Sequence, residues 1–207
     1  MADAAFQDFV AALAARTPAP GGGAAAARTA AMGAALFAMV LRYSVGKPAN
    51  REHEAELGAA LATVDGVLMR ILPLDDLDMA AFTRVLDAYR LPKDGEAAAA
   101  EREAAIQTAL AGAMEIPARL GQFCEEVLEA IVPVAGCIGR NIVADLCTGA
   151  ELLLAAGRSA RAMVAINALG LRDREAAARA LASVDAVLGS IGAHRDRIRA
   201  HVDAAIG

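Results

Sequence analysis

TPAPGGGA, at residues 17–24, separates a short helical pattern from a long apolar one. Its two prolines oppose helix formation and its three glycines carry no side chain, so the backbone can turn sharply here and lie close against another group. In residues 24–41, which follow, Arg28 is the only charged residue. A helix over these residues is apolar on almost every side, so we predict that it is buried.

The N-terminus of this helix has a chemical property of its own. Its first backbone N–H groups have no partner within the helix, and the helix dipole is positive at this end. A carboxylate or a carbonyl-bearing ring could use both. The glycine triplet does not follow a strand or match a phosphate-binding fingerprint, so we do not expect it to bind a nucleotide.

The composition indicates a helical protein with closely packed helices. The 207 residues are 57% hydrophobic but only 3% aromatic, and alanine, the best helix former and one of the smallest core residues, carries the excess. Apolar residues recur at helical spacing, and no alternating run of β-branched residues occurs. We therefore predict an all-α multihelical bundle that forms one domain over residues 1–207.

Proline and glycine divide the chain into helical segments. Apolar residues spaced by three and four predict a short first helix near residues 6–13, which Pro18 ends and which we expect to lie across the bundle. The last helix is predicted over residues 173–206. The segments between are separated or bent at residues 42–50, Pro73, residues 91–96, Pro117, residues 136–141 and Gly170.

Charge and apolar content restrict the partners. A formal net charge of -5 leaves no basic stripe to release phosphate counterions, which argues against a general nucleic-acid binder. Small molecules or other subunits are the expected partners. Two very apolar helices are hard to bury in so small a domain, so we also expect an extensive interface between subunits.

The chain also lacks the marks of export, of a disulfide framework and of a membrane span. Residues 1–6 have neither the basic region nor the long apolar run of a signal peptide. Cys124, Cys137 and Cys147 are an odd number without short paired spacings, so we expect buried thiols in the reducing cytoplasm. Residues 24–41 approach spanning length but are mostly alanine and glycine, so no membrane span is expected.

Two carboxylates stand out, each with an ordinary structural alternative. Asn141, Asp145 and Thr148 share one face of a mostly apolar helix, where a carboxylate is costly unless it meets a partner or faces a cavity. Asp145 could equally be a capping or inter-helix hydrogen-bond acceptor. Asp78, four residues before Phe82, could be a functional group or an ordinary first-turn aspartate.

Lys47 and Asn167 are polar residues in special places. Lys47 lies between Gly46 and Pro48, where a short loop could aim its amine inward, although loop lysines are usually solvated. Asn167 lies near the end of a buried helix and could serve only to satisfy backbone carbonyls. The three histidines form no ligand set, so no metal site is expected.

In order along the chain, these landmarks resemble the cyclodeaminase/cyclohydrolase family. The resemblance rests on TPAPGGGAAAARTAAMGAAL from residue 17, VGK at residues 45–47, DMAAFTRVLDAYRLPK at 78–93, AAIQTALAGAMEIP at 104–117, NIVADL at 141–146 and VAINALGLRD at 164–173. Each piece is weak alone, but the ordered series covers nearly the whole chain. Ala24 and Ala144 stand where the family usually has serine.

The resemblance implies an intertwined homodimer that acts on a one-carbon derivative of tetrahydrofolate, without a metal or redox cofactor. It also implies that one pocket is lined by residues from several segments. These are Pro20, Gly21, Gly22, Gly23, Asn141 and Asn167 as substrate-binding residues, and Lys47, Asp78 and Asp145 as catalytic ones.

The expected reaction is reversible hydrolysis of 5,10-methenyltetrahydrofolate to 10-formyltetrahydrofolate. Asp145 or Asp78 would orient the water or take its proton, Lys47 would carry a proton to the ring nitrogen, and Asn141 would hold the pterin or the water. Two alternatives are cyclodeamination of 5-formiminotetrahydrofolate and folate binding without catalysis. The alanines at positions 24 and 144 motivate the second alternative.

Overall fold

The computed structural model of the protein describes residues 4–207, and all regular structure in this range is helical. This confirms the predicted all-α bundle. In chain order, the helices and 3-10 segments (η) are α1 (Ala4–Ala14), α2 (Gly22–Arg42), η1 (Pro48–His53), α3 (Glu54–Ile71), α4 (Leu74–Arg90), α5 (Glu96–Ile131), η2 (Val132–Cys137), α6 (Val143–Gly170) and α7 (Arg174–Ile206).

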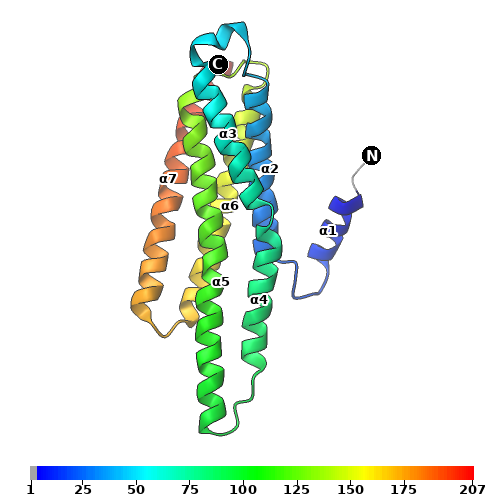
Figure 1. Ribbon diagram of the computed structural model, residues 1–207, viewed down its shortest axis with the longest axis vertical. Helices are drawn as coiled ribbons and strands as arrows, with labels where there is room; N and C mark the ends of the chain where they lie inside the picture. The colour runs from blue at the N-terminus through cyan, green and yellow to red at the C-terminus, as the bar shows by residue number, and fades with distance from the viewer. Residues whose placement is uncertain (1–3) are drawn as a thin grey trace.

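The long helices run side by side along one axis (Figure 1). The predicted break at Pro73 separates α3 from α4, whereas α5 continues through Pro117 as a single helix. Asp173 caps α7, because its carboxylate accepts a hydrogen bond of 2.8 Å from the backbone N–H of Ala176. The loop after α2, η1 and η2 all lie at one end of the bundle.

Most of helix α2 is buried in the bundle, as its composition predicts, but Met32 and Ala35 are exposed, so burial on every side is not observed. Its alanines and Phe37 belong to the main core, which α3, α5, α6 and α7 complete. The helix packs very closely against α6, since a Cβ built on Gly33 would lie 3.0 Å from the carbonyl oxygen of Gly149. A smaller core joins α4, α5, α6 and α7 at the other end of the bundle.

Helix α1 does not lie across the bundle, so that expectation is wrong. It ends at Ala14, four residues before Pro18, and stands to the side of the bundle near the start of α2 (Figure 1). Its visible anchor is Phe9, whose ring centroid lies 3.5 Å from the guanidinium carbon of Arg28. Phe6 and Val10 remain largely exposed.

All three cysteines are free thiols. Cys124 is buried as expected, and burial raises the pKa of its thiol to about 12. Cys137 and Cys147 are only half-buried, so the prediction of buried thiols was wrong for them, because one ends η2 and the other lies near the start of α6.

Two further expectations keep their status as predictions. Residues 1–3, on which the signal-peptide argument partly rests, lie outside the described part of the chain. The expectation that the chain has no membrane span also stays a prediction, because four helical stretches are long and apolar enough to cross a membrane by length and composition alone. They are Gly22–Arg42, Pro48–Arg90, Val143–Gly170 and Arg174–Ile206.

Candidate active site

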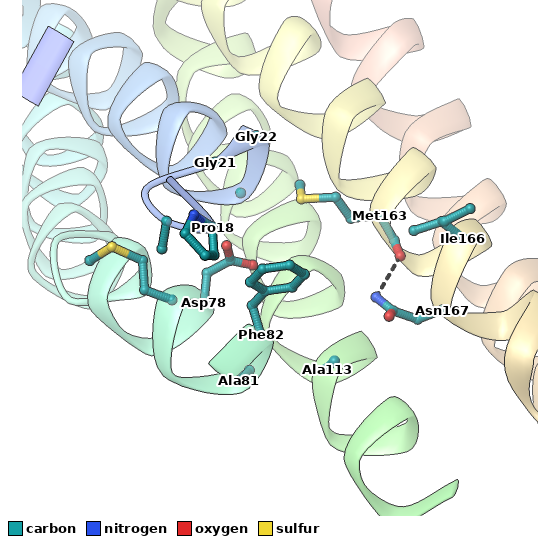
Figure 2. A pocket seen from close by; sticks show the side chains of 13 residues that line it. Pro18, Gly21, Gly22, Asp78, Ala81, Phe82, Ala113, Met163, Ile166 and Asn167 are labelled. Atoms are coloured by element: carbon teal, nitrogen blue, oxygen red, sulfur yellow. Dashed lines mark hydrogen bonds between the residues drawn. The ribbon is translucent and has the colours of Figure 1, made fainter. Parts of the chain in front are cut away.

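A cavity of about 350 Å³ lies where the start of α2 meets α4, α5 and α6 (Figure 2). Its lining includes five of the predicted site residues, and Pro20 lies in the same loop between two lining residues. The lining residues are Pro18, Ala19, Gly21, Gly22, Gly23, Asp78, Met79, Ala81, Phe82, Ala113, Met163, Ile166 and Asn167.

The carboxylate of Asp78 lies directly against Gly23 in the first turn of α2. A Cβ built on Gly23 would overlap Cγ and both carboxylate oxygens of Asp78, whereas one built on Gly22 would meet open space. Only glycine at position 23 therefore permits this contact. The close approach predicted for the glycines is made by a carboxylate of the same chain, at the positive end of the helix dipole.

Asp78 is electrostatically unusual for an aspartate near a helix start. Burial raises the pKa of its carboxyl group above the ordinary value of 3.8, because the charged form loses part of its solvation. Desolvation is the cause of the shift. The carboxylate is therefore a stronger base than a solvated aspartate and would interact favourably with a positively charged ligand in the cavity.

The other walls of the cavity are apolar. Phe82 follows Asp78 by one helical turn on α4, and Met163 and Ile166 face it from α6 (Figure 2). The side of the cavity formed by Phe82 and Ile166 opens to the surface, since these residues are 42% and 66% exposed. Such walls suit a flat ring system that stacks on an aromatic side chain.

Asn167 has the structural role that the sequence allows for it, and it also lines the cavity. Its Nδ2 donates a hydrogen bond of 2.9 Å to the carbonyl oxygen of Met163, so the amide does satisfy a backbone group of α6. That bond uses one donor and fixes the side chain at the cavity (Figure 2). The carbonyl oxygen of the amide makes no hydrogen bond within residues 4–207 and can accept one from a ligand.

Lys47, Asn141 and Asp145 form a second group away from this cavity. A Cβ built on Gly139 would lie 2.9 Å from Oδ1 of Asn141 and 3.8 Å from Nζ of Lys47, so the amide and the amine flank the same glycine. Asp145 follows in the first turn of α6, one turn after Asn141. We refer to Lys47, Asn141 and Asp145 as the lysine group.

The loop that carries Lys47 is held firmly. Gly46 has a φ of +74°, in the left-handed region that favours glycine, and its N–H donates to both carboxylate oxygens of Glu54 at 3.1 and 3.0 Å. The buried amide of Asn50 donates to the carbonyl oxygens of Ser44 and Cys137 at 2.9 and 3.0 Å. Asn50 therefore ties this loop to η2, a role that the sequence analysis did not assign to it.

The lysine group and the cavity lie at opposite ends of α2. Gly23 is in the first turn of this 21-residue helix and Lys47 follows its last residue. At a rise of about 1.5 Å per residue, the two groups are about 30 Å apart along the helix. One protomer therefore does not bring together all the residues predicted for the site.

Met163 and Ile166 are cavity residues that the sequence analysis missed. Both are apolar residues on a long apolar helix, where helical spacing alone predicts a core position. Only the neighbouring Asn167 could have drawn attention to this part of α6. The described residues contain no cluster of three or more His, Cys, Asp or Glu side chains that could hold a metal ion.

The sequence of the chain matches a family profile and proteins of known activity. The profile of the formiminotransferase-cyclodeaminase family matches residues 5–186. The chain is 36% identical over 193 residues to a methenyltetrahydrofolate cyclohydrolase of Methylorubrum extorquens, a match that covers 93% of each sequence.

Two other matches differ in extent. The chain is 30% identical over 171 residues to the formimidoyltransferase-cyclodeaminase of Rattus norvegicus, which is 83% of this chain but only 32% of that longer protein. The crystal structure of formiminotetrahydrofolate cyclodeaminase from Thermotoga maritima superposes with a TM-score of 0.87 at 23% identity, covering 97% of this chain and 96% of that one. At that identity the superposition establishes the shared fold.

Proposed function

The chain belongs to the formiminotransferase-cyclodeaminase family, and we propose that within it this protein is a methenyltetrahydrofolate cyclohydrolase. The observation that carries the proposal is the 36% identity to a cyclohydrolase over 93% of both chains. A full-length match supports a shared activity more strongly than a match to about a third of a bifunctional protein.

The cavity suits the substrate of that reaction. In 5,10-methenyltetrahydrofolate the reacting carbon lies between two nitrogens and shares a positive charge with them. The Asp78 carboxylate would stabilise this cation, and Phe82 and Met163 would cover the faces of its rings. Asn167 and the free backbone N–H groups at the start of α2 are hydrogen-bonding groups for the pterin.

The reaction requires proton transfers in a defined order. Water adds to the methenyl carbon as a base takes one of its protons. The bond from this carbon to N5 of the pterin then breaks, N5 takes up a proton, and the hydroxyl loses its proton to become the formyl C=O. One water is consumed and one proton is released.

We assign the first proton transfer to Asp78, because among residues 4–207 it is the one carboxylate that lines the cavity. Its raised pKa makes it a better base than a solvated aspartate, and general base catalysis of this kind contributes about a hundred- to ten-thousandfold. We assign delivery of the proton to N5 to Lys47, and placement of the substrate or water to Asn141 and Asp145, which would reach the cavity of one protomer from the second protomer of a homodimer. The substrate carries the one-carbon group, so the proposal includes no further cofactor.

We also propose that the protein is a cytoplasmic homodimer. Several apolar side chains on α2 and α6 are exposed in the protomer, among them Met32 and Ile166. A second subunit would bury them. The mass in solution, measured by light scattering, tests this directly, and the mass of a single 21.1 kDa chain at micromolar concentration would contradict it.

A pair of assays tests the activity. Purified protein is added to 5,10-methenyltetrahydrofolate and loss of its near-ultraviolet absorbance is followed, and the assay is repeated with 5-formiminotetrahydrofolate while ammonia is measured. We expect faster hydrolysis of the methenyl compound and no ammonia. Ammonia release would favour the cyclodeaminase, which the family description also names. No acceleration with either compound, while folate still binds, would leave a non-catalytic folate-binding protein.

A further inference from the structure

We propose that Arg28 and Asp75 form a positioning pair that holds the carboxylate of Asp78 at the first turn of α2. The proposal rests on the function proposed above, because it gives the pair a role in hydrolysis through the base. Neither member of the pair lines the Asp78 cavity, so the pair would affect the reaction only by placing that carboxylate.

Arg28 is the single charge in the apolar run of residues 24–41, and its side chain pairs with Asp75. The Nε of Arg28 donates to Oδ2 of Asp75 at 2.9 Å. The other oxygen, Oδ1, accepts a hydrogen bond of 2.8 Å from the backbone N–H of Asp76. The Asp75 side chain is only 12% exposed, so both of its oxygens are held in a nearly buried place.

The pair lies beside the contact between Gly23 and Asp78, so α2 and α4 meet at two neighbouring points. Gly23 precedes Arg28 by about 7.5 Å along α2, and Asp75 precedes Asp78 by about 4.5 Å along α4. One point of contact would let α4 slide or turn about it. Two points restrain both movements.

The pair also restrains rotation of α4 about its own axis. Leu74 and Ala81 are buried in the two cores of the bundle and hold one side of the helix. At about 100° per residue, these two residues lie about 40–60° to one side of Asp78 around the helix, and Asp75 lies about 60° to the other side. Asp78 is therefore placed between an apolar contact and an ionic one.

A small rotation of α4 is enough to misplace the base. The side chains of a helix end about 5–6 Å from its axis, so a rotation of about 10° moves the Asp78 carboxylate by about 1 Å. A misplacement of about 1 Å can cost about a hundredfold in rate. Loss of the pair would therefore slow the reaction while the bundle stays folded.

The state of Asp78 indicates that Arg28 acts through position and not as a neighbouring charge. Burial raises the pKa of the Asp78 carboxyl group, whereas a guanidinium close enough to interact with it would lower that pKa. Within residues 4–207, no other titratable side chain lines the cavity. The basicity of Asp78 thus depends on where the carboxylate is held.

Helix α1 contacts the pair from outside the bundle. The ring centroid of Phe9 lies 3.5 Å from the guanidinium carbon of Arg28. Phe6, together with Arg28 and Asp75, lines a second cavity of about 330 Å³. The Phe9 ring shields the guanidinium from water, which strengthens its attraction to the carboxylate. Although no residue of α1 lines the Asp78 cavity, this helix would influence the rate through the pair.

The kinetics of Arg28 variants test the proposal. Arg28→Ala should lower kcat by at least about tenfold at a temperature where circular dichroism shows that the variant is folded. Arg28→Lys keeps a cation for Asp75 but loses the planar group that stacks on Phe9, so its kcat should fall less. Equal losses in the two variants would contradict an ionic role for Arg28.

Arg70→Ala is the matched control. Arg70 also donates to a carboxylate on another helix, that of Glu126, and it also lies over an aromatic ring, that of Phe123, at 4.7 Å. This pair joins α3 to α5, so its loss does not release α4 from α2. The variant should have the wild-type kcat.

A second background shows whether Arg28 acts through Asp78. Asp78→Asn keeps the size of the side chain and removes the base. In that background, Arg28→Ala should change the residual rate by less than about twofold, because the group that Arg28 positions is absent. A further tenfold fall would show that Arg28 affects the reaction independently of Asp78, and it would overturn the proposal.

An NMR titration tests the position of the carboxylate without using activity. The double variant Arg28→Ala/Asp75→Ala removes one positive and one negative charge, so the net charge near Asp78 is kept. We expect the carboxyl 13C titration of Asp78 to move from its raised midpoint toward 3.8, because a displaced carboxylate regains solvation. An unchanged midpoint would overturn the positioning role.

The experiments separate the possible failures. An active wild type with an equally fast Arg28→Ala variant would overturn the pair and leave the proposed function intact. A wild type that is inactive toward both folate compounds, but whose Asp78 titration moves in the double variant, would contradict the proposed function. That result would still support the hold of the pair on Asp78.

Discussion

The carboxylate of Asp78 occupies the space that the side chain of any residue other than glycine would need at position 23. A Cβ on Gly23 would overlap Cγ and both oxygens of Asp78. The neighbouring Gly22 has no such neighbour. The glycine triplet therefore contains one position where the absence of a side chain is required by a contact, and that contact is with the proposed base.

Gly23→Ala should disable the site with little loss of stability. The added methyl group would push the Asp78 carboxylate away from the first turn of α2 and out of position for the attacking water. Because a displacement of about 1 Å can cost about a hundredfold in rate, we expect kcat/KM to fall by at least tenfold. Alanine is a better helix former than glycine, so its helix propensity offsets part of the stability that the clash costs. The melting temperature should therefore fall little.

Gly66→Ala is the matched control for that variant. Gly66 is an exposed position on α3, and a Cβ there would meet open space. The substitution should stabilise the helix by up to about 1 kcal/mol and leave the rate unchanged. Equal rates in the Gly23→Ala and Gly66→Ala variants would show that the Gly23 contact does not position the base.

The rate should depend on the ionisation of Asp78. A base must be deprotonated to act, so activity is present above the pKa of Asp78 and is lost as the pH falls through it. Because burial raises this pKa, the loss should centre above pH 3.8, the ordinary aspartate value. The measurement is kcat/KM against pH, with the carboxyl 13C shift of Asp78 followed by NMR as an independent titration. A shift that titrates at or below 3.8 would contradict the assignment.

Asp78→Asn should stabilise the protein at neutral pH. The folded state holds the Asp78 proton more tightly than the unfolded state, so the stability associated with this group is fully present below pH 3.8 and is lost as the pH rises through the higher folded pKa. Asparagine avoids that loss. We expect a rise in Tm of about 1–2 °C at pH 7, allowing for solvent screening of a half-buried group. A Tm difference that does not shrink below pH 3.8 would rule out this cause.

The fold could be predicted in most respects, because its signals are local. The prolines and glycines between the helices limit where each helix can extend, and the uncharged run after Arg28 predicts a helix that is largely buried. The placement of α1 could not be predicted. Its anchor is the contact between Phe9 and Arg28. This contact depends on how α2 is oriented, so the spacing of apolar residues does not predict it.

Some residues of the candidate cavity could be predicted from the sequence, but their arrangement could not. Asp78 and Asn167 lie together with the glycines because α4 and α6 both pass the start of α2. Lys47 lies beyond the far end of that helix. The sequence pattern does not show whether two polar residues lie in one site or at opposite ends of a helix. A site that two copies of the chain share would be hidden from the sequence for the same reason.

Lys47→Ala and Asp145→Asn should each slow the reaction without unfolding the protein. Each removes a group assigned to the reacting centre, so we expect at least a tenfold loss in kcat/KM with unchanged circular dichroism. Lys93→Ala, which removes the other lysine of the chain from an exposed loop, is the control and should have the wild-type rate. Wild-type turnover in both site variants would remove the lysine group from the mechanism.

Arg28→Ala should destabilise the protein and release α1. Arg28 donates to Asp75 at 2.9 Å, and the Asp75 side chain is only 12% exposed, so the substitution leaves a nearly buried carboxylate without its cation. It also removes the stacking partner of Phe9. We expect the free energy of unfolding, measured in urea, to fall by about 1–2 kcal/mol, with faster proteolysis between α1 and α2.

Arg42→Ala is the control. It breaks an ion pair with Asp65 in which both side chains are exposed, so it should lower the free energy of unfolding by less than about 0.5 kcal/mol. Equal losses in the two variants would show that burial of Asp75 does not set the strength of the Arg28 pair.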